Sequence, residues 1–152
     1  MTIYAAVLIL HSWLRWVVLA AGLLAWVRSA FGSSKAWTRT DERAGFWFVT
    51  TLDLQLVLGL VLYFLLSPTT AAVMRNFGAA MKDPALRFWA VEHVFGMIIG
   101  VALAHIGRVR ARRGDGWRRH RTTAIFFGLA LLAIAISIPW PGSLQGRPLL
   151  RW

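Results

Sequence analysis

The sequence contains no cysteine among its 152 residues, and only six of its residues are acidic. The lack of cysteine excludes disulfide bonds, thiolate metal sites, iron–sulfur clusters and covalent haem attachment through a Cys-x-x-Cys-His motif. The sequence also lacks a glycine-rich phosphate loop, a Gly-x-Ser-x-Gly elbow and a His-Glu-x-x-His motif. Hydrolytic chemistry is therefore not expected.

The shortage of acidic residues against 17 basic ones gives a formal net charge of +11. In a soluble protein such a balance would indicate nucleic-acid binding. Here most basic residues lie in the gaps between apolar runs, where they set membrane topology and contact anionic lipid. We therefore expect the lipid bilayer, and no nucleic acid, as the partner of this charge.

Four long apolar runs occupy residues 3–27, 46–66, 88–106 and 122–138, in a chain that is 58% hydrophobic. A bilayer core about 30 Å thick needs about 20 helical residues, so each run is a candidate membrane span. The first run is far longer than the apolar part of a signal peptide, so we expect a span there and no cleavable signal. Short connections predict one all-α domain over residues 1–152, an integral-membrane four-helix bundle in up-down-up-down order.

Apolar residues recur at helical spacing in the second connection, over about residues 72–82. This pattern predicts a short amphipathic helix on the outer surface, serving as a plain interfacial anchor. The functional alternative is a lid over a pocket that opens outward.

The basic residues are distributed unequally between the two sides of the predicted bundle. The first and third connections carry eleven of them: Arg28, Lys35, Arg39, Arg43, Arg108, Arg110, Arg112, Arg113, Arg118, Arg119 and Arg121. The second connection and the tail carry five: Arg75, Lys82, Arg87, Arg147 and Arg151. The positive-inside rule then predicts cytoplasmic first and third connections and both termini outside.

Two histidines lie inside predicted spans, His11 in the first and His93 in the third. Ionisable groups within a membrane span are costly and therefore indicate function. The two spans run in the same direction, and each histidine lies a few residues from the outer end, so we expect similar depths. Neutral imidazole is an axial ligand of haem iron, so the pair predicts one haem held between His11 and His93.

Small residues follow His93 on its helix, with Gly96 at i+3 and Gly100 at i+7. A face without side chains would let a flat group approach the backbone, and with His93 on that face we favour haem binding. The alternative is a small-xxx-small contact with a neighbouring helix, which needs no cofactor.

Each of the other polar residues in the spans could have a structural or a functional role. We expect Arg15, one turn after His11, to form a salt bridge with Asp53 of the second span. Alternatively, Arg15 neutralises a haem propionate or binds a quinone carbonyl. Gln55 could hydrogen-bond a ligand or another helix, and Glu92 could pair with Arg87 or accept a proton from a quinol.

His105 and His120 both lie toward the cytoplasmic side. Together they could form a second haem or metal site at that mouth of the bundle. His105 is twelve residues beyond His93, which is about 18 Å along the axis and about 120° around it. Because those angles do not favour a two-haem helix, we favour interfacial polar roles for both residues.

These residues carry a resemblance that covers nearly the whole chain. The strings are His11-Ser-Trp-Leu-Arg15-Trp16, Asp53-Leu-Gln-Leu-Val-Leu-Gly59, Arg87-Phe-Trp-Ala-Val-Glu92-His93, His105-Ile-Gly-Arg108 and Ile138-Pro-Trp-Pro141. They resemble small four-span bacterial membrane proteins of the cytochrome b-like type. The resemblance implies a b-type cytochrome of the bacterial cytoplasmic membrane, in which His11 and His93 match the motif histidines. Relatives can carry His where this chain has Asp53, so the resemblance implies no haem ligand from the second span of this chain.

Three functional hypotheses follow. The first is a membrane cytochrome that passes electrons between quinol and an outer acceptor, alone or within a larger complex. The second is an accessory subunit of a respiratory or photosynthetic assembly that binds lipid, quinone or pigment, in contact with other subunits or with further copies of itself. The third, a small transporter or proton path through Arg15, Asp53 and Glu92, is less favoured because these charges do not share a face.

Overall fold

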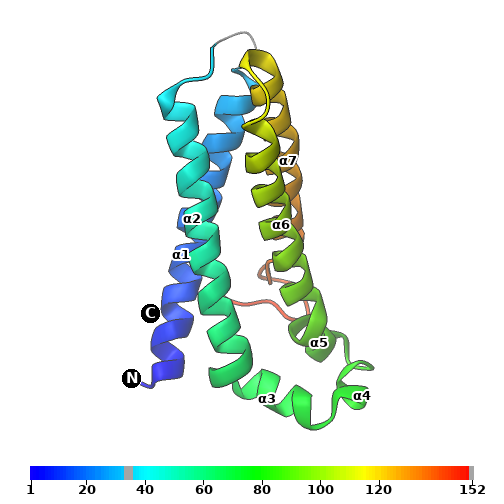
Figure 1. The fold of residues 1–152 in the computed structure, drawn as a ribbon. Helices are drawn as coiled ribbons and strands as arrows, with labels where there is room; N and C mark the ends of the chain where they lie inside the picture. The colour runs from blue at the N-terminus through cyan, green and yellow to red at the C-terminus, as the bar shows by residue number, and fades with distance from the viewer. Residues whose placement is uncertain (33–35, 151–152) are drawn as a thin grey trace.

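The computed structural model describes residues 1–32 and 36–150, so Lys35 and Arg151 of the charge count lie outside the described residues. The described chain is helical and contains no strand. Figure 1 shows the succession of helices. These are α1 (Ile3–Ala30), α2 (Arg39–Val61), η1 (Leu62–Leu66), α3 (Pro68–Arg75), α4 (Phe77–Ala80), α5 (Pro84–Arg87), η2 (Phe88–Glu92), α6 (His93–Ala111) and α7 (Gly116–Ser137).

Four continuous helical stretches are long and apolar enough to cross a membrane: Ile3–Ala30, Arg39–Leu66, Pro84–Ala111 and Gly116–Ser137. Three of them have 28 residues and the fourth has 22. At 1.5 Å per residue the longer ones reach about 42 Å. This confirms the predicted all-helical chain with four apolar spans. Consecutive long helices run in opposite directions in Figure 1.

The last three long helices begin earlier than predicted, at residues 39, 84 and 116 in place of 46, 88 and 122. The prediction followed apolar content, whereas the helices continue into polar ends that are capped locally. Thr38 and Asp41 form a reciprocal capping box at the start of α2. Asp83 accepts a hydrogen bond from the Leu86 backbone N–H, and Pro84 occupies the first turn of α5.

The predicted helix over 72–82 is divided into two, α3 and α4, and begins earlier, at Pro68. The break falls at Asn76, whose backbone leaves the helical region (φ −145°, ψ 69°) and whose side chain accepts from the Ala79 N–H. Val73 and Ala80 are buried with Ala90 of η2 in a small second core. The segment is therefore packed against the bundle end and does not form one continuous surface helix.

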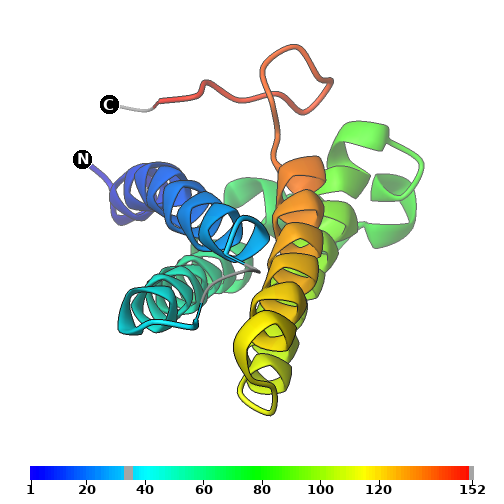
Figure 2. The same cartoon turned by 90° about the horizontal axis from the view of Figure 1, so that it is seen from above.

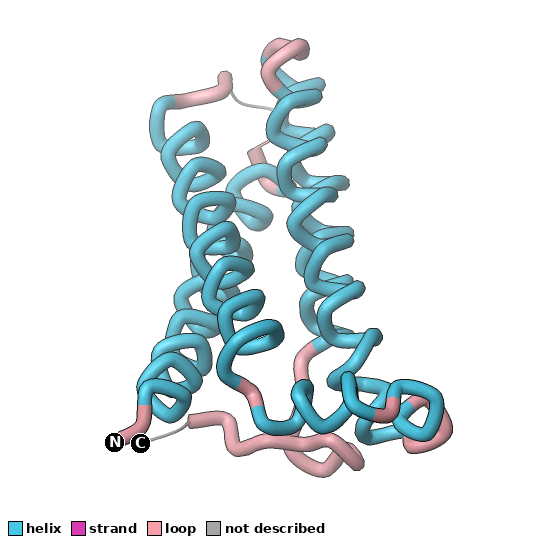
Figure 3. Tube along the Cα trace, turned by 60° about the horizontal axis from the view of Figure 1, so that its bottom comes forward, coloured by secondary structure: helices cyan, strands magenta, loops and turns pink. Residues whose placement is uncertain are grey.

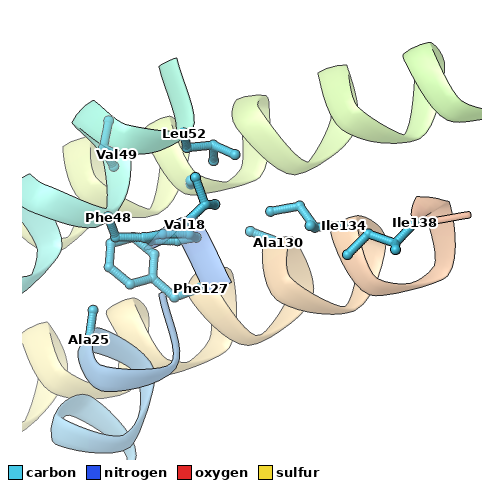
Figure 4. Packing of buried hydrophobic residues seen from close by; sticks show 10 residues of the cluster. Val18, Ala25, Phe48, Val49, Leu52, Phe127, Ala130, Ile134 and Ile138 are labelled. Carbon is cyan, nitrogen blue, oxygen red and sulfur yellow. The ribbon is translucent and has the colours of Figure 1, made fainter. Parts of the chain in front are cut away.

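The long helices form two pairs, α1 with α2 and α6 with α7, as the view in Figure 2 shows. The main core lies between the pairs. Phe48 of α2 and Phe127 of α7 meet edge to face there, with ring centroids 5.0 Å apart. Figure 4 shows Val18, Leu52 and Ile134 packing around the same core.

Two acidic residues in the first turn of α2 connect all four long helices at one end of the bundle. Asp41 pairs with Arg28 of α1 at 2.8 Å. Glu42 pairs with Arg108 of α6 at 3.0 Å and also with Arg119 of α7. Charged groups at a span end can stay hydrated, so these acidic residues and their arginines form a clamp that holds the helices together where no apolar core reaches.

The tail after α7 crosses the opposite end of the bundle, where the N-terminus also lies (Figure 3). Ile138 leaves the helical region (ψ 134°), and Pro139 and Pro141 prevent any continuation of α7. Residues 138–150 therefore return across this end of the helices as a non-helical strap, with turns at 141–145.

We expect Glu42→Gln to lower the free energy of unfolding by about 1–2 kcal/mol, since charged hydrogen bonds contribute about 1.5–3 kcal/mol and the carboxylate is partly exposed. Thermal unfolding in detergent measures this. The matched control is Glu92→Gln, which removes an exposed pair with Arg87 at 2.7 Å and should change stability little. Equal stability of Glu42→Gln and the native chain would contradict the proposed clamp.

Candidate functional site

A cavity lies between the two helix pairs, toward the end that carries α3 and the tail. Its volume is about 150 Å³, and the empty space including its opening is about 1340 Å³. Both His11 and His93 line it. The rest of the lining is mainly apolar and includes Leu8, Leu52, Leu56, Met97, Val101 and Ile134. A mainly apolar cavity with a few polar groups is typical of a ligand or cofactor site.

The His93 ring is held by a backbone carbonyl. Its Nδ1 lies 2.7 Å from the carbonyl oxygen of Ser137, the last residue of α7. A carbonyl can only accept, so Nδ1 carries the proton and donates, which leaves Nε2 with its lone pair. Metal-ligating histidines are commonly oriented by this kind of second hydrogen bond.

The Ser137 carbonyl is available because of the proline pattern that follows α7. In an α-helix its partner would be the backbone N–H four residues on, and that residue is Pro141, which has none. Likewise Pro139 cannot supply the partner of the Ala135 carbonyl, which accepts from Trp140 Nε1 at 2.7 Å and from the Ile138 backbone N–H at 3.4 Å. Both carbonyls at this helix end thus accept from a side chain.

Two π-helical segments, η1 and η2, adjoin the cavity, and a side chain donates to one backbone carbonyl in each. Tyr63 of η1 donates its hydroxyl to the Ala90 carbonyl of η2 at 2.7 Å. Thr70 of α3 donates its hydroxyl to the Tyr63 carbonyl, also at 2.7 Å. Tyr63 and Trp89 both line the cavity. Short π-helical segments are frequent at functional sites, and here η2 directly precedes His93.

His11 packs closely on Gly59 of α2. A Cβ atom built on Gly59 would lie 3.2 Å from His11 Cε1. Gln55, one turn earlier, donates its Nε2 to the His11 backbone carbonyl at 2.9 Å. His11 Nδ1 and Gln55 Oε1 are buried without a hydrogen-bond partner among the described residues. Gln55, Gly59 and Tyr63, which follow one another at i, i+4 and i+8, therefore all line the cavity, and the first two support His11.

The strap closes one side of the cavity, and Pro139, Arg147 and Pro148 belong to the lining. The Leu149 carbonyl accepts from an Arg15 Nη at 2.6 Å and from Trp16 Nε1 at 3.0 Å. Arg147 lies over the Trp89 ring, 5.2 Å from its centroid. The strap is thus fixed to α1 and to η2, and it brings a second guanidinium to the cavity beside Arg15.

The predicted Arg15–Asp53 salt bridge is wrong. The Asp53 carboxylate pairs instead with His105 of α6, with Oδ1 and Nε2 2.8 Å apart. Arg15 lines the cavity on α1 and reaches the strap, so the two side chains leave their helices in different directions. The predicted pairing of Arg87 with Glu92 is confirmed, at 2.7 Å.

Gly96 and Gly100 do not line the cavity, which corrects their predicted place beside a cofactor. A Cβ on Gly96 would lie 1.8 Å from Ser137 Oγ, and one on Gly100 would lie 2.8 Å from Ile134. Both glycines therefore let α6 and α7 approach closely, the small-residue contact that was the structural alternative. Their effect on the site is indirect, since this approach brings the Ser137 carbonyl to His93.

His105 and His120, the predicted second pair, have different neighbours in the structure. His105 is paired with Asp53, whereas His120 is buried at 1% exposure with its ring centroid 4.9 Å from that of Trp37. Residues 1–32 and 36–150 contain no group of three or more His, Asp or Glu that could hold a metal ion. The structure thus gives no support to a second site made of these two residues.

Ser137, Trp89 and Arg147 are residues of the site that the sequence reasoning missed. A signal was available for Ser137, because it stands four residues before Pro141 in a span that ends at Pro139. No signal was available for Arg147, because a tail of this composition does not show which helices it crosses.

Comparison with known protein families finds none that matches this chain, and comparisons with curated proteins and with solved structures also find no match. Functional inference consequently depends on the cavity itself.

We expect Gly96→Ala to lower the free energy of unfolding by about 1–3 kcal/mol, the usual cost of overpacking a close helix contact. Adding Ser137→Ala should restore part of the loss, because the nearest atom is the Ser137 Oγ. Gly78→Ala is the control, since nothing lies within 4 Å of a Cβ there. Denaturant titration in detergent measures all three. A Gly96→Ala variant as stable as the native chain would mean that α6 and α7 do not meet at this face.

Proposed function

We propose that this chain is a membrane-bound b-type cytochrome that carries one haem between His11 and His93. The observation that supports this most is that both imidazoles line one apolar cavity from different helix pairs. Two histidines on separate helices of a bundle are the donor set that bis-imidazole ligation requires.

The residues around the cavity fit such a group. His93 has the tautomer a metal ligand needs, with Nδ1 on a carbonyl and Nε2 available. The unpartnered Nδ1 of His11 is buried beside the same cavity. Arg15 and Arg147 line it and could neutralise the two propionates. Bound haem would supply one-electron transfer, and the apolar lining would keep water from the iron.

Orientation follows from charge. The clamp end of the bundle carries the basic first and third connections, so we place that end in the cytoplasm and both termini outside. The cavity then lies toward the outer face of a bacterial cytoplasmic membrane. Electrons would pass between membrane quinol and an outer acceptor, with the chain acting alone or within a larger complex.

The four histidines provide the test of the proposed ligands. We expect the purified native protein, expressed with adequate haem, to show reduced-minus-oxidised b-type bands. His11→Ala and His93→Ala should each lose most of the bound haem, because a bis-imidazole site needs both ligands. His105→Ala and His120→Ala should retain it, since neither residue lines the cavity. Haem content per polypeptide by absorption spectroscopy is the measurement.

Absence of haem bands in the native protein would end the proposal and leave the accessory-subunit hypothesis in its place. Loss of haem in His105→Ala, with retention in His93→Ala, would move the site away from this cavity.

Gly59→Ala tests the support of His11. The added methyl group would force the ring to shift by a few tenths of an ångström, because its Cβ would lie 3.2 Å from Cε1. We expect about tenfold weaker haem binding, in the range seen when groups supporting a ligand are altered. Haem titration of the apoprotein measures this, with Gly78→Ala as control. Unchanged affinity in a folded Gly59→Ala protein would show that His11 does not need this contact.

A further inference from the structure

An ionisable pair lies on the exposed sides of two helices, outside the cavity. Asp53 of α2 and His105 of α6 join the two helices through a 2.8 Å contact between Oδ1 and Nε2. Their side chains are 45% and 48% exposed. The pair is therefore exposed to the lipid or protein that surrounds the helices.

That surrounding is the apolar part of the membrane. Asp53 is the fifteenth residue of the 28-residue helical stretch Arg39–Leu66, and His105 lies about 9 Å before the end of Pro84–Ala111, so the pair lies in the half of the spans nearer the basic end. Large apolar side chains are exposed on the same two helices, among them Phe46, Leu54, Val57, Ile98, Ile106 and Val109. Lipid chains beside such an apolar surface solvate a carboxylate and an imidazole poorly. Ionisable residues within spans accordingly face protein or a water-filled cavity in nearly all cases.

The pair also has hydrogen-bonding capacity that the described chain leaves unused. Within residues 1–32 and 36–150, the only hydrogen bond of the Asp53 carboxylate is to His105, and the reverse is true of the His105 ring. One carboxylate oxygen and one ring nitrogen thus remain for a partner. These two groups complement each other, because Nδ1–H can donate to a carboxylate.

We propose that this surface, defined by Asp53, His105 and the exposed apolar residues beside them, is the interface between two copies of this chain in the membrane. A twofold axis passing beside the pair would set Asp53 of each copy against His105 of the other. A single patch that presents both an acid and a base is self-complementary in this way, whereas an unrelated partner would need a matching pair of its own. The apolar neighbours alone would not require a cover, since lipid satisfies them equally well.

Cysteine cross-linking tests the interface directly, because the chain has no cysteine of its own. Val57→Cys places a thiol on the surface, and Leu132→Cys places one on α7, at the same 56% exposure. In liposomes at a low protein-to-lipid ratio, oxidation should give a disulfide-linked dimer with Val57→Cys and little with Leu132→Cys. Equal cross-linking at the two positions would indicate random collision and overturn the proposal.

Removal of the pair tests its role. Asp53→Leu with His105→Leu replaces both groups by side chains that lipid accepts, so the fold is retained while dimerisation weakens by about tenfold. The control is Arg87→Gln with Glu92→Gln, which removes a pair of similar exposure (46% and 48%) at a helix end. Energy transfer between labelled copies in liposomes measures the dimer fraction. An unchanged dimer fraction in the leucine variant, or a monomeric native protein, would overturn the proposal.

The dimerisation experiments can fail while the haem experiment succeeds, and the reverse, because His105 lies outside the cavity.

Discussion

Inside a membrane every backbone carbonyl must find a donor within the protein, and this constraint decides how the site is built. Regular helices satisfy it by themselves. This chain breaks regularity at two π-helical segments and at the prolines after α7, all close to the cavity. Side chains donate to backbone carbonyls at these places: Tyr63 to that of Ala90, Thr70 to that of Tyr63, Trp140 to that of Ala135 and His93 to that of Ser137. The orientation of His93 is thus a consequence of where the helices stop being regular.

The two ends of the bundle are held by different physics. At the basic end, Asp41 and Glu42 at the start of α2 connect the four long helices through arginines, and Phe48 and Phe127 fill the space below them. At the other end the helix pairs leave a cavity, which η1, η2, α3 and the strap close from the side. A bundle closed tightly at one end can keep an open space at the other without losing its fold. That division explains why His11 and His93, which lie toward the end with the cavity, both line it, while His105 and His120 lie elsewhere.

Polar residues in these spans fall into three groups according to what they contact. His11, Gln55, Tyr63 and His93 line the cavity. Asp41 and Glu42 remain at a helix end where water reaches. Asp53 and His105 satisfy each other on the outer surface. The first group contains the ligands of the proposed haem site, and the third belongs to the proposed interface between two copies of the chain. A buried ionisable residue in a membrane sequence is therefore a sign of function without saying which function.

The sequence by itself determined that the chain is helical, that it has four apolar spans, and that His11 and His93 lie at comparable depth. Each of these follows from local composition and from the fixed rise of a helix. The tertiary structure decided which faces meet. It alone shows that Asp53 turns toward His105 and not toward Arg15, that Gly96 and Gly100 pack on α7, and that the strap carries Arg147 to the cavity. The rotation of a helix about its axis depends on packing against its neighbours, and when nearly every side of a span is apolar, the sequence pattern leaves that rotation undetermined.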